Sequence, residues 1–222
     1  MKRIILDRYD SIIALTKGKC VLDLGCVDHD LIRRDRSLWL HDVIRATAKK
    51  CVGVDYVQDV VEILKKEGYD IRAGNVETIN LNEKFDLVMA GELIEHLPNP
   101  GRLLETARRH LNETGLLVLT TPNATGLYYF LNNLCFRHDR DNPDHCLMFT
   151  VCTMQKLLEK CGFEMVDAKY IMGWSPQGHA SGFFRLLAWM KNIIKAPVYL
   201  LFPTLCHRMF IVARPLAGTA PS

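Results

Sequence analysis

Two carboxylates and an imidazole stand close together in the segment GELIEHLP, residues 91–98. If this segment is helical, Glu92, Glu95 and His96 occupy positions i, i+3 and i+4 and share one face. Such a face can bind a divalent ion, or it can supply a general base without a metal. A third interpretation is structural, with the same side chains bracing the segment. The spacing leaves these three roles open.

A second candidate site begins at the run VLDLG, residues 21–25. An apolar run that reaches an acid and then a glycine is typical of a nucleotide-binding loop. The dinucleotide fingerprint GxGxxG needs two more glycines, and this chain has Val27 and Asp30 at those positions. A nicotinamide or flavin dinucleotide is therefore disfavoured. A nucleoside without phosphates needs one glycine for close approach and one acid for the ribose diol. Asp55, at the end of the run CVGVD, provides that acid.

Apolar runs of strand length alternate with helical patterns along the whole chain, which predicts one α/β domain over residues 1–222 with a mostly parallel sheet. Ligands of such sheets bind beyond the carboxyl ends of the strands, where the polar residues above occur. The predicted strands are 20–25, 51–55, 69–73, 85–90, 116–120, 163–171 and 209–213, and the predicted helices are 7–16, 38–50, 57–67, 100–111 and 150–161.

In this order and spacing, the segments resemble the class I S-adenosylmethionine-dependent methyltransferases, in particular the branch of quinone-biosynthesis O-methyltransferases and small-molecule methyltransferases. VLDLGC resembles their first motif, GVDY (53–56) their ribose-binding acid, and GNVE (74–77) their adenine loop. The resemblance covers about residues 18–170 and a last strand near 210. It implies a Rossmann-like, doubly wound, mostly parallel seven-stranded sheet with an antiparallel last strand, preceded by an apolar helical insertion at about 182–206.

The resemblance also assigns residues to the methyl donor, S-adenosylmethionine. The chain departs from the family pattern in the loop after Gly25, where Val27 and His29 stand in place of the usual glycines. It also has Asn75 where the family usually has Asp. The amide oxygen of Asn75 can still accept a hydrogen bond from the adenine amino group. Trp39 or His41 lies near the donor or, alternatively, packs in the core. The expected donor-binding residues are Asp23, Gly25, Cys26, Asp55, Tyr56, Asn75, Val76 and Gly91.

The ExxEH pattern resembles two metal-using branches of the family, the quinone-biosynthesis enzymes and the small-RNA 2′-O-methyltransferases. In the second branch, a histidine from a later segment completes the metal site. The resemblance therefore implies a divalent ion, not assigned among Mg, Mn, Fe and Zn, and His138 is a second candidate for the later histidine. The expected metal ligands are Glu92, Glu95, His96 and His145, and the expected catalytic residues are His96 and Glu92.

The composition of the chain limits the classes of binding partner and the cellular compartment that we expect. The net charge is +3 and no basic stripe alternates with aromatic residues, so a nucleic-acid partner is not expected. Eight cysteines form no CxxC pair, and no run of apolar residues is long enough to span a bilayer, so we expect a cytoplasmic protein. The apolar segment 183–203 has four alternative interpretations. It is a core helix, a cap over the acceptor pocket, a homodimer contact or a peripheral membrane contact.

The expected function is methylation, by S-adenosylmethionine, of an oxygen on a small-molecule, glycan or lipid-linked acceptor. Quinone-like phenols and sugars of a surface glycan both fit this expectation. An alternative is a catalytically inactive scaffold protein of methyltransferase fold that binds the donor or a partner. The missing glycines after Gly25 favour this alternative.

Overall fold

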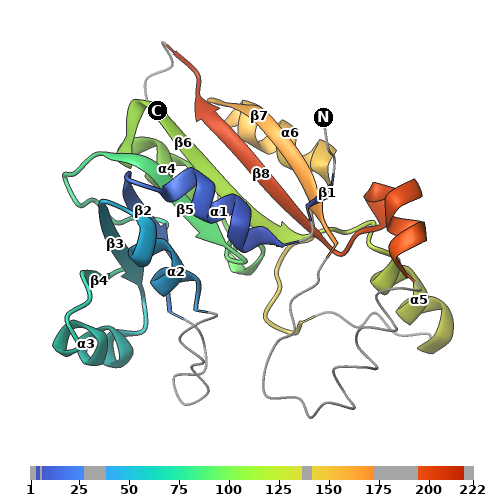
Figure 1. The fold of residues 1–222 in the computed structure, drawn as a ribbon, viewed down its shortest axis with the longest axis horizontal. Coiled ribbons are helices and arrows are strands. Elements are labelled where there is room, and N and C mark those ends of the chain that lie inside the picture. The colour runs from blue at the N-terminus through green and yellow to red at the C-terminus, as the bar shows by residue number, and fades with distance from the viewer. Residues whose placement is uncertain (1–3, 6, 28–38, 137–141, 173–194, 218–222) are drawn as a thin grey trace.

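The computed structural model describes residues 4–5, 7–27, 39–136, 142–172 and 195–217 of the 222-residue chain. One eight-stranded sheet runs through the molecule in the order β1-β7-β8-β6-β5-β2-β3-β4 (Figure 1). The strands are β1 (Ile4–Ile5), β2 (Cys20–Leu24), β3 (Lys50–Asp55), β4 (Ile71–Ala73), β5 (Phe85–Gly91), β6 (Leu111–Pro122), β7 (Phe163–Ile171) and β8 (Arg208–Pro215).

The direction of the strands confirms the predicted fold class. Strands β2 to β6 pair in parallel, and β8 lies antiparallel between β6 and β7. The structure adds one strand to the predicted seven, because the two-residue strand β1 pairs in parallel with β7 at the edge of the sheet. Two residues are too few to show a strand pattern in the sequence.

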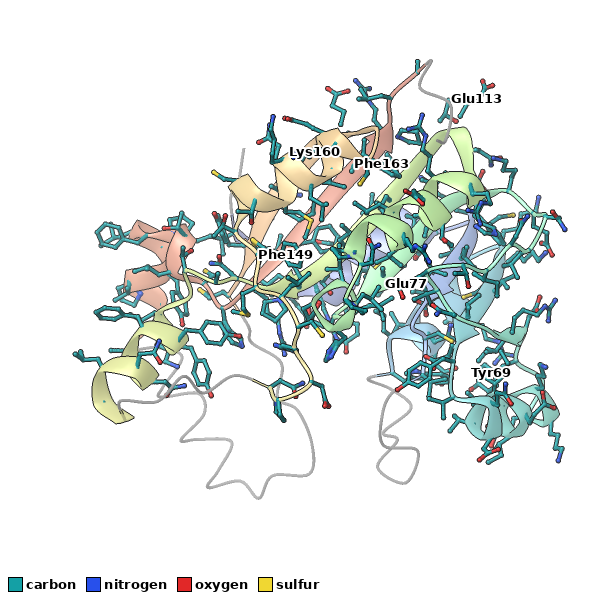
Figure 2. The ribbon with its side chains drawn as sticks, turned by 180° about the vertical axis from the view of Figure 1, so that it is seen from behind. Tyr69, Glu77, Glu113, Phe149, Lys160 and Phe163 are labelled. Carbon is teal, nitrogen blue, oxygen red and sulfur yellow. The ribbon has the colours of Figure 1, made fainter. Side chains whose placement is uncertain are left out.

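Helices cover both faces of the sheet. Helices α1 (Arg8–Thr16) and α2 (Leu40–Thr47) lie on the face seen in Figure 1, and α4 (Pro100–His110) and α6 (Val151–Lys160) lie on the opposite face, seen in Figure 2. Two clusters of buried apolar side chains fill the layers between sheet and helices. Side chains of β2 alternate between them, because successive residues of a strand point to opposite faces. Val21 belongs to the α1–α2 side, and Leu22 and Leu24 belong to the α4–α6 side.

Three further helices and two short 3₁₀ turns complete the described chain. Helix α3 (Gln58–Lys66) packs beside β4, and α5 (Leu127–Phe136) follows β6. The 3₁₀ turns are η3 (Ile94–His96) and η4 (Pro203–Leu205). Of the predicted apolar insertion, residues 182–194 lie outside the described part, whereas 195–201 form a helix directly before η4. No described helix is both long and apolar enough to cross a membrane.

Candidate functional site

A cavity of about 870 Å³ opens at the carboxyl ends of β2, β3 and β5. This volume falls within the usual range for sites that hold a small molecule or cofactor. The parallel register makes these strand ends neighbours, with Leu24 beside Val54 on one side and beside Ala90 on the other. The lining residues include seven of the eight expected donor-binding residues, namely Gly25, Cys26, Asp55, Tyr56, Asn75, Val76 and Gly91.

Asp55 is fixed in place at the tip of β3. Its carboxylate accepts a hydrogen bond from the backbone N–H of Val27 at 2.9 Å and another from that of Val57 at 3.2 Å. The residue is 4% exposed, yet it lines the cavity. Each carboxylate oxygen can accept a second hydrogen bond. The geometry therefore suits Asp55 to accept hydrogen bonds from a vicinal diol.

The two glycines at the strand ends let other side chains approach the cavity wall closely. Gly25 adopts a left-handed conformation with φ 70°, and a Cβ atom there would lie 2.8 Å from Cδ1 of Leu93. A Cβ atom on Gly91 would lie 2.8 Å from Cδ2 of Leu40. Both neighbouring leucines line the cavity. Glycine at these two positions thus keeps the floor of the cavity open between β2 and β5.

The wall next to β2 is formed by Trp39 and Cys26. The indole N–H of Trp39 donates to the backbone carbonyl of Cys26 at 2.7 Å, and both side chains are buried. Burial, followed by the nearby carboxylates of Asp23 and Asp55, raises the pKa of the Cys26 thiol well above its ordinary value. The thiol is therefore neutral and contributes an apolar surface. The sequence leaves two positions open for Trp39, one near the donor and one packed in the core. The structure places its side chain in a buried cluster that also forms part of the cavity wall.

Asp23 is the one expected donor-binding residue that does not line the cavity. Because strand residues alternate, Asp23 points with Val21 toward α2, where its carboxylate lies 2.9 Å from Nδ1 of His41. Both side chains are buried. This polar pair joins β2 to α2 inside the core, so the structure gives Asp23 and His41 a contact with each other and not with the cavity.

Asn75, expected to contact the adenine, lies on the cavity wall with its side chain held in a local turn. Its side-chain oxygen accepts a hydrogen bond from the backbone N–H of Glu77 at 2.8 Å, which closes a tight local turn. The oxygen keeps a second lone pair, and the residue lines the cavity together with Val76 and Glu77.

The prediction of one helical face over residues 92–96 is wrong at Glu92. This residue has a left-handed backbone with φ 51°, and the 3₁₀ turn η3 begins only after Leu93. Its carboxylate pairs with Arg8 of α1 at 3.5 Å and with Arg208 of β8 at 3.0 Å. The expected metal ligand Glu92 is thus turned toward two arginines, away from the positions that a helix would give it.

Arg8 is a cavity residue that sequence reasoning missed. Burial lowers the pKa of its guanidinium, but the Glu92 carboxylate and Tyr9 more than offset this, so the pKa lies above its ordinary value. Asp7 caps α1 by accepting from the backbone N–H of Tyr9, which places Arg8 in the first turn. Since Glu92 lies more than eighty positions away in the chain, local patterns carried no signal for this pair.

The other three expected metal ligands are brought together. Side-chain ligand atoms of Glu95, His96 and His145 all lie within 4.8 Å of one another, and the two imidazole rings meet edge to face at 4.7 Å. The backbone holds the arrangement, because the N–H groups of Cys146 and Leu147 donate to the carbonyl of Glu95. Of the three, His96 lines the cavity. The other candidate, His138, lies outside the described residues.

Glu95 is a buried carboxyl with an unusual environment. One of its oxygens accepts a hydrogen bond from the hydroxyl of Thr121 at 3.0 Å, and the other has no hydrogen-bond partner among the described residues. Burial, and secondarily the charge of Glu92, raises its pKa to about 8. At neutral pH, and without a bound cation, this carboxyl is therefore mostly protonated.

His96 is oriented by the neighbouring loop. Its Nδ1 lies 3.2 Å from the backbone carbonyl of Asp144, a distance at which a protonated Nδ1 donates to that oxygen. This tautomer leaves Nε2 as the nitrogen that accepts a proton.

Sequence comparison identifies the class of protein that this fold and cavity define. A family model described as a methyltransferase domain matches residues 1–168, so the chain belongs to this family of class I S-adenosylmethionine-dependent methyltransferases. The ubiquinone biosynthesis O-methyltransferase of Haemophilus ducreyi is 29% identical over 126 residues, which are 51% of this chain and 50% of that protein. The same-named protein of Bradyrhizobium diazoefficiens is 31% identical over 112 residues, 48% of this chain and 41% of that protein.

The chain thus spans about half the length of the curated relatives it matches. Solved structures share the fold at low identity. A methyltransferase from Archaeoglobus fulgidus superposes with a TM-score of 0.59 at 18% identity, covering 93% of this chain and 91% of that one. The cyclase SpnF superposes with a TM-score of 0.60 at 17% identity, covering 95% of this chain and 81% of that one. Enzymes of different named activities therefore use this fold.

Proposed function

We propose that the chain transfers a methyl group from S-adenosylmethionine to an oxygen atom of a small-molecule, glycan or lipid-linked acceptor. The observation that carries the proposal is Asp55, whose carboxylate is fixed at the rim of an 870 Å³ cavity beside Gly25 and Gly91. Methylation of oxygen is favoured because relatives that match half of the chain are named O-methyltransferases. One matching relative, from Papaver somniferum, is instead named an N-methyltransferase.

The residues of the cavity fit this donor in three respects. Asp55 accepts hydrogen bonds from the ribose hydroxyls, and Val76 with Asn75 borders the adenine. Gly25 and Gly91 leave room for the amino-acid part between β2 and β5. The donor supplies an activated methyl group, so the protein needs mainly to align the acceptor oxygen with it.

The acceptor end of the cavity is formed by Arg8, Glu92, His96 and Asp144. We assign the acceptance of the hydroxyl proton to Nε2 of His96, since the carbonyl of Asp144 orients this ring toward the required tautomer. As the oxygen–carbon bond forms and the carbon–sulfur bond breaks, that proton passes to His96. Glu92, also expected to be catalytic, serves in this proposal to hold Arg8 and Arg208.

Calorimetry with S-adenosylhomocysteine tests the donor site. Asp55→Asn removes the charge and one acceptor oxygen, and two hydrogen bonds to a charged group contribute enough for an affinity loss of about 10- to 100-fold. Asp59→Asn, an exposed acid on α3, is the matched control and leaves the affinity unchanged. Equal binding by both variants would refute the donor site.

Methyl transfer itself is tested with labelled donor against a panel of phenols, sugars and lipid-linked alcohols. Labelled product whose formation is abolished by His96→Ala supports the proposed reaction. A different outcome is that the protein binds S-adenosylhomocysteine in a manner that depends on Asp55 and yet methylates no acceptor in the panel. That result would favour the alternative, an inactive scaffold that binds the donor.

A second candidate role is a divalent cation bound by Glu95, His96 and His145. It is favoured by the convergence of their ligand atoms and by the unpartnered oxygen of Glu95. A cation there would polarise an acceptor hydroxyl next to His96. Elemental analysis of the purified protein tests this role, with His145→Ala losing the metal and Asp59→Asn retaining it. An equal metal content in both variants, or none in the parent protein, would exclude the metal role.

A further inference from the structure

A buried histidine outside the cavity has both ring nitrogens bound to backbone groups. His110 is the last residue of α4 and is 1% exposed. Its Nδ1 lies 2.8 Å from the carbonyl oxygen of Thr106, and its Nε2 lies 2.9 Å from the backbone nitrogen of Leu81. The carbonyl can only accept a hydrogen bond and the amide can only donate one, so Nδ1 carries the proton and Nε2 is the acceptor. The two contacts therefore fix His110 as one neutral tautomer.

The amide bound to this imidazole belongs to the segment 74–84, which joins β4 to β5 and contains no helix or strand. Hydrogen bonds to α4 hold this segment in place. The backbone N–H of Leu81 donates to His110, and the carbonyl of Ile79 accepts from the guanidinium of Arg109 at 3.2 Å. Two consecutive residues at the end of α4 thus hold the backbone of the segment at two points.

The beginning of the same segment forms one wall of the cavity. The cavity-lining residues of the segment are Asn75, Val76 and Glu77. The carbonyl of Asn75 accepts from the backbone N–H of Ile79 at 2.9 Å, and a Cβ atom on Gly74 would lie 2.5 Å from Cδ1 of Ile79. Val76 belongs to the buried cluster against which Ile79 and Leu81 pack. The place of residues 79–81 on α4 therefore determines the position of this wall.

Protonation of His110 is incompatible with the contact to Leu81. A proton on Nε2 would point at the backbone N–H of Leu81, so two donors would face each other. The positive charge of the imidazolium would also be buried while that proton has no acceptor, which is costly. The charged form of His110 therefore requires residues 79–81 to move away from α4.

The surroundings of His110 set the direction of its titration. Burial lowers the pKa of the imidazole, and the hydrogen bond to the carbonyl of Thr106 opposes this effect. Of the charged groups that face the ring, Arg109 of the same helix and Lys84 before β5 lower the pKa further, whereas Glu83 raises it. The pKa as a whole lies below its ordinary value, so the neutral form prevails at neutral pH and the charged form needs an acidic solution.

We propose that His110 is a positioning residue and acts as a proton-sensitive latch for the cavity wall at residues 75–77. A neutral imidazole keeps the segment on α4 and the wall in place, whereas an imidazolium releases the segment and disrupts the site where the adenine is proposed to bind. The effect on ligand affinity rests on the proposed function, because it takes the cavity as the donor site. The opening of the Leu81 hydrogen bond does not, because it occurs without any ligand.

Amide hydrogen exchange of the ligand-free protein tests the latch directly. We expect the protection factor of the Leu81 N–H, corrected for the intrinsic effect of pH, to fall by up to about tenfold per pH unit below the pKa of His110. The Hε1 resonance of the ring reports that pKa in the same sample. The amide of Val52, buried in β3, is the internal control and keeps its protection. Unchanged protection of Leu81 while His110 titrates would overturn the proposal.

His110→Gln provides a latch that cannot titrate, because its amide oxygen can accept from Leu81 at any pH. Calorimetry with S-adenosylhomocysteine at pH 7.5 and pH 5.5 compares this variant with the parent protein. We expect the affinity of the parent to fall about threefold more than that of His110→Gln, since only the latched fraction binds and all other titrating groups are common to both proteins. An equal fall in both would overturn the role of His110 in positioning the wall.

The two measurements separate this proposal from the proposed function. If the parent protein binds no S-adenosylhomocysteine at either pH, the donor site fails, and the exchange of the Leu81 amide still decides whether the latch exists. The exchange measurement uses the parent protein alone, so it also decides the question if His110→Gln does not fold.

Discussion

The buried carboxyl of Glu95 makes a strong prediction about stability and pH. The residue is 0% exposed, and its pKa is raised from 4.5 to about 8, chiefly by burial. In the unfolded chain the same carboxyl titrates near 4.5. The folded state therefore holds the proton more tightly than the unfolded state does. Its stabilising effect is fully present below pH 4.5 and is lost progressively as the pH rises toward 8.

The size of the effect follows from the difference between the two pKa values. Each pKa unit corresponds to about 1.4 kcal/mol, so the rise from 4.5 to about 8 amounts to on the order of 5 kcal/mol. Glu95→Gln keeps the size and the acceptor for Thr121 but cannot ionise. We therefore expect the two proteins to be similarly stable near pH 5, and the Gln variant to be more stable above pH 8 by up to that amount.

Urea unfolding between pH 5 and pH 9, in the presence of a chelator, measures this difference. Glu113→Gln, an exposed glutamate on β6 labelled in Figure 2, is the control and should follow the parent at every pH. Parallel stability curves for the parent and Glu95→Gln across this range would show that Glu95 does not hold a proton in the fold, and would refute the reasoning from its burial.

Two further predictions concern a glycine at the cavity and the buried asparagine that follows β6. Gly25→Ala and Gly18→Ala both place a side chain at φ near 70°, so each should lower the unfolding free energy by about 1–2 kcal/mol. Only Gly25→Ala should also weaken binding of S-adenosylhomocysteine in calorimetry, since its Cβ meets Leu93 whereas nothing lies within 4 Å at Gly18. Equal binding by both would refute this. Asn123→Ala removes the side-chain donor to the buried carbonyl of Cys206, whereas the carbonyl of Thr204 keeps the hydroxyl of Thr125 as a donor. The change should cost about 1–3 kcal/mol, a fall in Tm of roughly 3–10 °C that Asn133→Ala on the exposed side of α5 should not show.

Sequence patterns predicted the elements and the edge of the sheet where the cavity lies. Asp55 and Gly91 each end an apolar run, and parallel strands bring such ends to one edge, so their proximity followed from topology alone. The apolar runs also predicted the boundaries of most strands to within a few residues. The main difference is β6, which begins at Leu111 and not at 116, because its first residues include polar side chains outside the buried pattern.

Side-chain directions at the site were harder to predict. The sequence could not show that Asp23 turns toward His41, because the partner comes from a helix whose position depends on packing. Similarly, the spacing of Glu92 and Glu95 fits a helix, but Glu92 takes a left-handed backbone and pairs with Arg8. Contacts between distant segments decide both cases, and local periodicity carries no information about them.

The position of Trp39 has a practical consequence for studying this protein. Its indole is buried, lies on the cavity wall and is hydrogen-bonded to the carbonyl of Cys26. A molecule that enters the cavity changes the polarity next to this ring, so we expect the emission spectrum of Trp39 to shift. Subtracting the signal of Trp39→Phe removes the contribution of the other two tryptophans in the chain. The protein thus carries a built-in optical reporter, with which ligands can be titrated without a label.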